Sequence, residues 1–188
     1  MDAVIAVLLW PFVTLFQYLR FVVGILIALP FLLISRPRRH FDLFSTLAPL
    51  PLGVHVFSGI IGFYAPYSAT IAATVQDLSP KKCVLTFSDQ PWLRNPFSSV
   101  HAIALANAGE LCSGLLMVSA LQTTKLRAIP NVITTTYLKK ARGTIKAVSE
   151  AVTLEEGKTK DVEVSASLYD SKGVLVAVTK VCWAVSPR

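Results

Sequence analysis

The sequence predicts an α+β fold in which an antiparallel β-sheet packs around one long helix. Runs rich in β-branched residues occur as two segments before, and four segments after, one long stretch of small apolar residues typical of a buried helix. The connections within each group are short, so successive strands are expected to pair as hairpins. The expected elements are strands at 69–78, 82–89, 131–142, 143–154, 161–170 and 173–185, with the helix at about 99–121.

Turn and cap signals support these boundaries. A Ser-Pro turn at 79–80 separates the first two strands, and a Ser-Lys turn at 171–172 separates the last two. Ser98 or Ser99 is the expected N-cap of the helix, because a serine side chain accepts a hydrogen bond from the first helical turn. The segment between the two hairpin groups is therefore predicted to be a single continuous helix.

Two glycines lie inside the predicted helix, at Gly109 and Gly114. A glycine in a helix interior costs about 1 kcal/mol relative to alanine. We expect close contact between the helix and the sheet at these positions to offset that cost; a buried helix with incidental glycines is the alternative.

Residues 1–40 are predicted to anchor the chain in a membrane. Arg20 is the only charge in residues 3–34, and a bilayer core of ~30 Å needs ~20 apolar residues in a helix. Pro11 and Pro30 leave a bent or re-entrant segment open. A secretory signal peptide is the less favoured interpretation, because a basic start and a small-residue cleavage site are missing. A buried core helix is also less favoured, because the run is too long.

The basic flank of this run predicts its orientation. Arg36, Arg38 and Arg39 follow it directly, and positive residues accumulate on the cytoplasmic side of membrane segments. We expect the C-terminal part to face the cytosol; a basic linker without topological meaning is the alternative. Residues 41–66, with several prolines and glycines, predict an amphipathic connector of short helices, and residues 67–188 predict the folded domain.

Charge and cysteine content exclude some classes of protein. The net charge is +7, but residues 1–40 hold four Arg and one Asp, which leaves 14 basic and 10 acidic groups in the rest. This part has no basic stripe and no nucleic-acid motif. Cys83, Cys112 and Cys182 lack metal or disulfide spacing and predict buried free thiols in a reducing compartment. No metal site is expected, and His55 is interpreted as structural.

Three polar residues stand out around the apolar helix. Glu110 is its only charge, with His101 nine residues before it and Asn95 six residues before the histidine. Nine residues turn a helix through ~900° and advance it ~13 Å, so one chain cannot bring His101 and Glu110 to one small substrate. Two antiparallel copies can, which predicts a dimer with shared sites.

The same residue types suit attack on a carbonyl group. Unpaired N–H groups at a helix start, here that of Ala102, stabilise a developing oxyanion. A carboxylate in an apolar wall, such as Glu110, is tuned toward general-base catalysis, and the Asn95 amide is suited to holding water or the carbonyl. The alternative for each residue is a purely structural role.

The strand and helix order, together with Asn95, His101 and Glu110 at these spacings, resembles the hotdog-fold thioesterases, notably acyl-CoA thioesterases of the phenylacetate-degradation type. The resemblance covers about residues 66–187. It implies a hotdog fold, a dimer or dimer of dimers, and an acyl-CoA substrate without a further cofactor. The segments VHAIALANAGE and YLKKARGTIKA also resemble an uncharacterised branch of that superfamily.

The resemblance also implies roles for individual residues. Asn95 corresponds to the polarising Asn, His101 to the turn His, and Glu110 to the nucleophile or general base. The family's two glycines after the His are Ala102 and Ile103 here. The Ala102 N–H still suits an oxyanion donor, whereas the Ile103 side chain narrows the pocket.

A basic run after the third-strand candidate suggests a further contact with substrate. Lys139, Lys140 and Arg142 are suited to the phosphates of coenzyme A; a solvated strand edge is the alternative. A supplementary Ser or Thr has no clear counterpart, although Thr123 and Thr124 are near.

Two classes of function remain. The first is a membrane-associated acyl-CoA thioesterase that acts through Glu110, Asn95, His101 and the N–H of Ala102. The second is a non-catalytic hotdog module that binds acyl chains or a partner protein at a membrane, which the Ala102-Ile103 pair favours. A dehydratase acting on acyl thioesters is a weaker third. The acyl chain, and the choice between coenzyme A and acyl carrier protein, stay open.

Overall fold

The computed structural model describes residues 15, 19, 22, 26, 40–150, 152–155 and 159–188. The predicted membrane segment and its basic flank lie outside these residues, except for four helical positions and His40. The four positions have exposed side chains: Leu15, Leu19, Val22 and Leu26. Among the described residues, one helix is long and apolar enough to cross a bilayer, Ala102–Leu121, and it is the buried helix of the folded domain.

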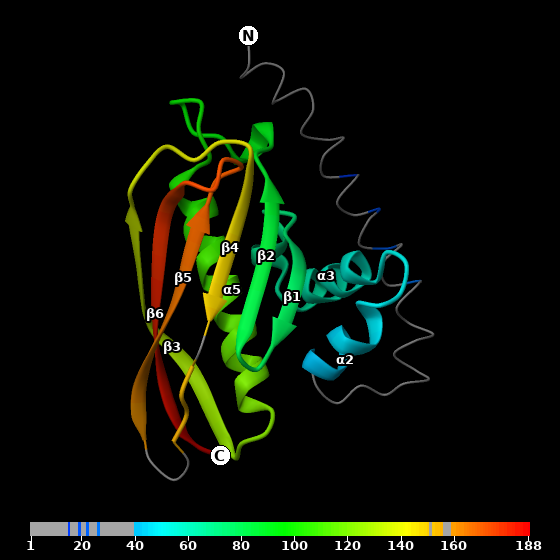
Figure 1. Ribbon diagram of the computed structural model, residues 1–188, viewed down its shortest axis with the longest axis vertical. Coiled ribbons are helices and arrows are strands. Elements are labelled where there is room, and N and C mark those ends of the chain that lie inside the picture. The colour runs from blue at the N-terminus through cyan, green and yellow to red at the C-terminus, as the bar shows by residue number, and fades with distance from the viewer. Residues whose placement is uncertain are drawn as a thin grey trace.

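Six strands form one antiparallel sheet in the order β1-β2-β4-β5-β6-β3. The predicted α+β class, with two strands, one long helix and four strands, is confirmed (Figure 1). The strands are β1 (Thr74–Ser79), β2 (Lys82–Ser88), β3 (Leu126–Tyr137), β4 (Thr144–Glu150), β5 (Lys160–Tyr169) and β6 (Leu175–Pro187).

The third strand differs from its predicted range of 131–142. The predicted range began after Pro130, and proline cannot donate a hydrogen bond to a neighbouring strand. β3 is an edge strand that pairs with β6, and a bulge lies between Pro130 and Val132. The proline is tolerated there, so the strand extends back to Leu126 and ends at Tyr137.

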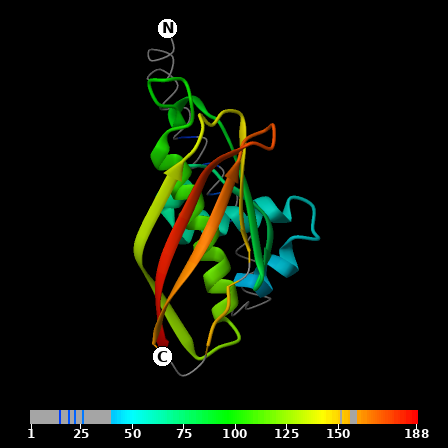
Figure 2. The same cartoon turned by 60° about the vertical axis from the view of Figure 1, so that its left-hand side comes forward.

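The long helix, α5 (Ala102–Leu121), runs along one face of the sheet (Figures 1 and 2). Its predicted start at Ser98 or Ser99 is wrong. His101 is the N-cap, and its Nδ1 accepts a hydrogen bond from the backbone N–H of Ile103 at 3.2 Å. Ser98 has a positive φ of 55°, and Ser99 is bonded within the preceding loop, so neither residue starts the helix.

The two helical glycines have different surroundings. A Cβ at Gly109 would overlap the Oγ1 and Cβ of Thr179, a fully buried residue on β6. The expected close approach of helix and sheet is therefore confirmed at this position. A Cβ at Gly114 would meet only ordinary contacts, with Glu110 Oε1 and Trp183 Cη2 each at 3.6 Å. The same expectation is wrong at Gly114, because space remains beside it.

Short helices occupy the region predicted as a connector. They are α2 (His40–Leu47), α3 (Gly53–Tyr64) and α4 (Pro66–Ala69). The Ser58 hydroxyl on α3 accepts a hydrogen bond from the Val75 N–H of β1 at 2.9 Å. α2 and α3 also contribute Leu43, Phe44, Phe57, Ile60 and Ile61 to the domain core. The helices therefore cover the β1 edge of the sheet, whereas β3 forms the other edge (Figure 1).

The three cysteines are free thiols. Cys83 and Cys112 are buried as predicted, and Cys182 is only partly buried. The Cys112 thiol donates to the Cys83 carbonyl oxygen at 3.4 Å, which links α5 to β2. A side-chain hydrogen bond with Cys112 and burial raise the pKa of the Cys83 thiol, so it stays protonated and unreactive.

Candidate functional site

Asn95 organises the loop that leads into α5. Its Oδ1 accepts hydrogen bonds from the backbone N–H groups of Phe97 at 3.0 Å and Ser99 at 3.3 Å. Its Nδ2 donates to the Ser99 hydroxyl at 3.0 Å. The side chain is thus occupied by its own loop, because asparagine readily bonds backbone groups a few residues ahead of it. Its predicted role in holding a carbonyl stays a prediction.

The start of α5 presents the predicted oxyanion donor. Ala102 is the first helical residue, so its N–H has no acceptor inside the helix. The imidazole of His101 is exposed and turned back to the Ile103 N–H, which fixes the N-cap. Tyr137, at the end of β3, donates its hydroxyl to the Ala102 carbonyl oxygen at 3.0 Å. Burial raises the pKa of that phenol, so it remains a hydrogen-bond donor.

The predicted phosphate-binding cations lie near this helix start, in the loop between β3 and β4. Their alternative assignment to a strand edge is wrong, because β3 ends at Tyr137. Arg142 Nε donates to the Ser98 carbonyl oxygen at 3.0 Å, and Lys140 Nζ lies 5.9 Å from the centre of the Phe97 ring. Lys139 is exposed. The loop therefore adds positive charge to the end of the molecule where the N-terminus of α5 lies.

Glu110 lies two and a half turns further along α5. Among the described residues, its carboxylate has no ion-pair or hydrogen-bond partner, and the side chain is half-buried. Burial raises the pKa of this carboxyl, because removing the charged form from water is unfavourable. The neighbouring Trp183 indole and the space at Gly114 make its surroundings apolar.

An incompletely buried stripe runs along the same helix. Its members are spaced three or four residues apart, so they share one face of α5. All of them except the glutamate are apolar: Ile103, Ala106, Glu110, Gly114 and Val118. The side chains of Ile103 and Val118 are 55% and 38% exposed, so the sheet of the same chain does not cover this face.

Two threonines near Glu110 were missed by the sequence analysis. Thr135 on β3 and Thr179 on β6 are paired across the sheet, and their hydroxyl oxygens lie 3.0 Å apart. Thr179 packs against Gly109, the residue before Glu110. Strand alternation in the run 133–137 is the signal that places Thr135 on the helix side. Thr124, by contrast, bonds the Leu121 carbonyl oxygen at the other end of α5.

The structure thus divides the predicted site residues into two groups within one chain. Asn95, His101 and Ala102 meet the cationic loop at the helix start. Glu110 lies further along α5, where Gly109 packs against Thr179 and Gly114 lies near Trp183. Within the parts of the chain that the structure describes, no group of three His, Cys, Asp or Glu side chains is arranged to hold a metal ion.

Comparison with known protein families gives a match for this chain. Residues 53–185 match the family described as domain of unknown function DUF4442. A search of curated proteins found no match.

Solved structures share the architecture. A structural-genomics target protein has a TM-score of 0.69 at 29% identity, over 79% of this chain and 99% of that one. A thioesterase of Staphylococcus aureus subsp. aureus Mu50 has a TM-score of 0.56 at 18% identity, over 65% of this chain and 99% of that one. A thioesterase of Haemophilus influenzae has a TM-score of 0.55 at 14% identity, over 64% and 82%. The predicted hotdog fold is thereby confirmed, while likeness to the phenylacetate-degradation type stays a prediction.

Proposed function

We propose, from the premise that this chain belongs to the DUF4442 family and has the hotdog fold, that it hydrolyses acyl thioesters. The observation that carries the proposal is Glu110, a carboxylate with a raised pKa in the apolar stripe of the core helix, without an ion-pair partner among the described residues. The S. aureus and H. influenzae thioesterases built on the same fold support the reaction class.

In the proposed reaction, Glu110 acts as a general base. Its carboxylate takes a proton from water while the water oxygen attacks the thioester carbonyl carbon. The carbonyl oxygen becomes an oxyanion, which accepts a hydrogen bond from the Ala102 N–H at the positive end of the helix dipole. When the carbon–sulfur bond breaks, the proton passes to the thiolate sulfur, and a carboxylic acid and a thiol leave.

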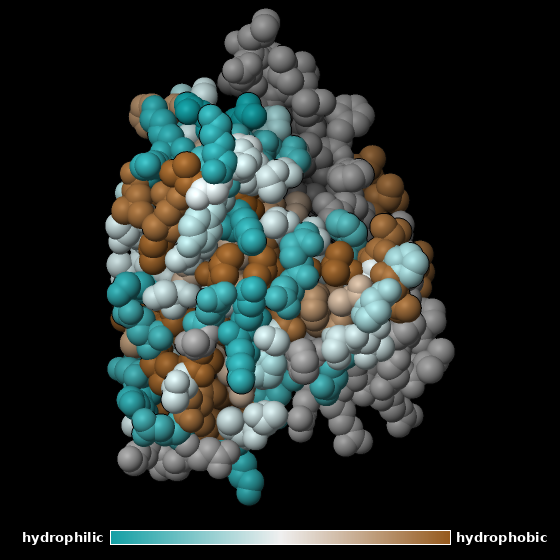
Figure 3. Space-filling model, in the orientation of Figure 1, coloured by the Kyte–Doolittle hydropathy of each residue, from teal (hydrophilic) through white to brown (hydrophobic). Residues whose placement is uncertain are grey.

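The reaction needs groups from two copies of the chain. Glu110 and the Ala102 N–H of one chain are separated by about 12 Å along α5, at a rise of 1.5 Å per residue. An antiparallel second copy brings the Glu110 of one chain to the helix start of the other. The apolar stripe of α5 and the exposed β3 edge are the surfaces available for that contact (Figure 3 shows hydrophobic side chains over the β3 side of the sheet).

The thioester carrier is proposed to approach along the cationic loop. Lys139, Lys140 and Arg142 lie at the same end of α5 as the Ala102 N–H. Their charges suit the phosphates of coenzyme A, because Lys and Arg bind phosphate through charge-assisted hydrogen bonds. Exposed Phe97, over which Lys140 lies, offers a flat apolar surface beside them.

A substitution of Glu110 tests the proposal. Glu110→Gln keeps the shape of the side chain but removes the base, so thiol release from acyl-CoA substrates is expected to fall by about 10²–10⁴-fold. The release is followed with a thiol-reactive dye, and sedimentation velocity checks that the dimer is intact. Glu163→Gln serves as the control, because this exposed glutamate pairs with Lys180 on the strands away from the site. Unchanged turnover in Glu110→Gln would remove Glu110 from the mechanism.

A non-catalytic acyl-binding module is the second candidate. Two observations favour it. The exposed Ile103 side chain stands beside the predicted oxyanion donor, and the Asn95 amide is taken up by its own loop. Binding of acyl-CoA without thiol release, unchanged in Glu110→Gln, would select this function over hydrolysis.

A further inference from the structure

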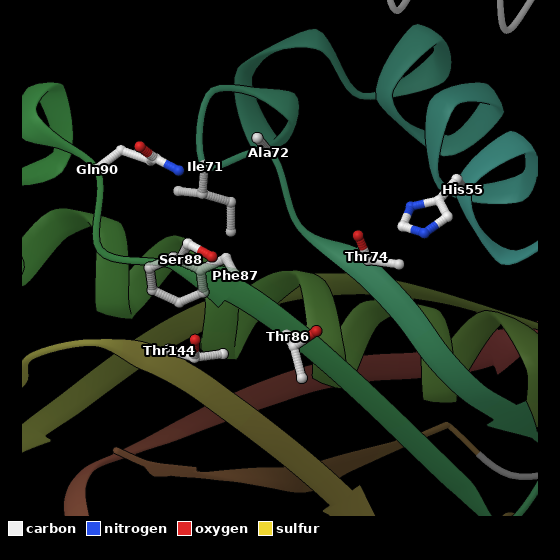
Figure 4. A pocket seen from close by; sticks show the side chains of 9 residues that line it. All are labelled: His55, Ile71, Ala72, Thr74, Thr86, Phe87, Ser88, Gln90 and Thr144. Atoms are coloured by element: carbon white, nitrogen blue, oxygen red, sulfur yellow. The ribbon is translucent and has the colours of Figure 1, made fainter. Parts of the chain in front are cut away.

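A cavity lies on the face of the sheet opposite α5. Its volume is about 420 Å³, within the ~300–1,000 Å³ of small-molecule sites. Val75, Phe87 and Ile145 are buried against the core, so their neighbours along the strands point to the other face. Those neighbours line the cavity together with Phe87, α3 and two loops (Figure 4); the lining residues are Thr74, Thr86, Phe87, Ser88 and Thr144, with His55, Ile71, Ala72 and Gln90.

The strand pairing explains why the hydroxyl groups converge. Thr74 of β1 is directly opposite Thr86 of β2, and Ser88 of β2 is directly opposite Thr144 of β4. Four hydroxyl side chains therefore form a cluster across three adjacent strands. His55 projects from α3 toward Thr74 on the other side of the cavity (Figure 4).

Most of these polar side chains have no hydrogen-bond partner among the residues that the structure describes. The Thr86 hydroxyl accepts a hydrogen bond from Gln76 at 3.1 Å. For the other polar side chains of the lining, the described part of the chain supplies no hydrogen-bond partner; they are His55, Thr74, Ser88, Gln90 and Thr144. His55, Ser88 and Thr144 are exposed, and Thr74 and Gln90 are half-buried, so water can reach these groups. A polar ligand can replace the hydrogen bonds to water, whereas an apolar ligand would leave the groups without hydrogen bonds.

The charge of the lining residues indicates which class of polar ligand suits the cavity. Its described residues include no Asp, Glu, Lys or Arg. Asp89, between Ser88 and Gln90 in the chain, is engaged by Arg94 Nε at 2.9 Å and by the Gly143 N–H at 3.3 Å. Lys146 neighbours Thr86 in the sheet register but does not line the cavity. Phosphate and carboxylate ligands accept hydrogen bonds only and favour fixed positive charge, which this wall does not provide.

Hydroxyl, amide and neutral imidazole groups share one property: each both donates and accepts hydrogen bonds. Ligand hydroxyl groups do the same. We propose that this cavity binds a neutral polyhydroxylated group of about the size of a monosaccharide, at a site separated by the sheet from Glu110. His55, interpreted from the sequence as structural, is a ligand-binding residue in this proposal.

Such a group has two sources, a free sugar or polyol and the headgroup of a glycolipid. Leu52, three residues before His55, is 70% exposed and is the N-cap residue of α3. An apolar side chain at this position is compatible with an acyl chain or with a membrane surface near the cavity. The two sources share the same headgroup chemistry and are distinguished by experiment.

Ligand binding to the full chain tests the proposal. Glucose and myo-inositol are titrated by saturation-transfer NMR, with glucose 6-phosphate and acetate as anionic comparisons. The variant Ser88→Ala/Thr144→Val removes two facing hydroxyls and is expected to weaken polyol binding about tenfold or more, at about 1 kcal/mol per hydrogen bond. The control, Ser165→Ala/Thr134→Val, makes the same chemical changes on the same face of β5 and β3, away from the cavity.

The outcomes separate the interpretations. Polyol binding that is lost in the cavity variant, kept in its control and kept in Glu110→Gln supports the site. Preferential binding to phosphatidylcholine vesicles that contain a glucosyl diacylglycerol, relative to phosphatidylcholine alone, assigns the headgroup to a lipid; binding of free glucose alone assigns it to a soluble ligand. No binding of any polyol, binding unaffected by Ser88→Ala/Thr144→Val, or preference for the anionic compounds would overturn the proposal. Thermal unfolding confirms that both variants are folded.

Discussion

Glu110 occupies a position that costs the protein stability. The carboxylate is half-buried and has no ion-pair or hydrogen-bond partner among the described residues. Glu110 Oε1 and Trp183 Cη2 each lie 3.6 Å from the position that a Cβ would take at Gly114. A residue that served only the fold would be apolar here, because the rest of the stripe is apolar. The unfavourable placement of the charge is the physical reason for assigning Glu110 to chemistry.

The raised pKa of Glu110 gives a pH-dependent prediction. The folded state binds the proton more tightly than the unfolded chain does, so stability falls as pH rises through the interval above the usual pKa of 4.5. Glu110→Gln removes this titration. The variant is expected to unfold at a higher temperature than the original protein at neutral pH, and the difference should disappear below pH 4.5. A variant less stable at neutral pH would show that the carboxylate has a favourable partner.

The decrease of enzymatic activity at acidic pH should depend on the protonation of Glu110. A general base works only when it is ionised, so kcat/KM for an acyl thioester is expected to decrease as pH falls through the raised pKa of Glu110. Initial rates measured across the acidic range check this. A profile that falls only below pH 4.5, the usual pKa of a glutamate, would contradict it.

Alanine substitutions at two glycines, Gly109 in α5 and Gly59 in α3, test how closely single residues are packed. Gly109→Ala places a Cβ against the buried Thr179, so it is expected to destabilise the fold by about 1–3 kcal/mol. Gly59→Ala is the matched control, because no atom lies within 4 Å of its Cβ position in α3. There the higher helix propensity of alanine should stabilise by about 0.5–1 kcal/mol. Urea unfolding measures both, and effects of the same sign would refute the proposed contact.

The two edges of the sheet differ in whether other elements cover them. β1 is covered by α2 and α3, and its Val75 N–H donates to Ser58. β3 exposes Val132, Ile133 and other apolar side chains at the opposite edge. An uncovered edge strand with apolar residues is prone to pair with another chain, and α5 presents its stripe on the same side as β3.

This asymmetry predicts where the dimer forms. Ile133 lies on the helix side of β3, since it alternates with Thr135, and is 50% exposed. Ile133→Asp is expected to shift the protein from dimer to monomer in sedimentation velocity and to lower thioester hydrolysis at least as much as Glu110→Gln, because each site needs both chains. Thr134→Asp puts the same charge on the outer face and should leave the dimer intact. A dimer that survives Ile133→Asp would place the contact elsewhere.

At the scale of the whole molecule, membrane attachment remains a prediction for residues outside the described structure. Val22→Asp/Leu26→Asp is expected to release the full chain from membranes in carbonate extraction, because each charge near the centre of a bilayer costs about 3 kcal/mol. Leu50→Asp adds a charge at an exposed position of the connector and serves as the control. Release of the unchanged protein by carbonate would refute the anchor.

The sequence determined the order of the elements, because strand alternation and the long apolar helix are local patterns that need no knowledge of neighbours. It also identified Glu110, since one charge in an apolar helix is visible without a structure. The sequence-based predictions were wrong at positions whose structure depends on contacts with residues distant in the chain. Pro130 is tolerated only because β3 is an edge strand, and the helix starts at Ala102 because Asn95 and Ser99 bond each other in the preceding loop.

The separation of His101 from Glu110 within one chain followed from helix geometry, but only the tertiary structure decided which other groups meet. It joined the cationic loop to the helix start and gathered hydroxyls from three strands into a cavity that no single segment encodes. The physical reason is that hydrogen-bond partners, burial and the resulting pKa shifts depend on residues far apart in the chain. Sequence patterns specify which face each side chain occupies, whereas the register and packing of the sheet determine what lies opposite it.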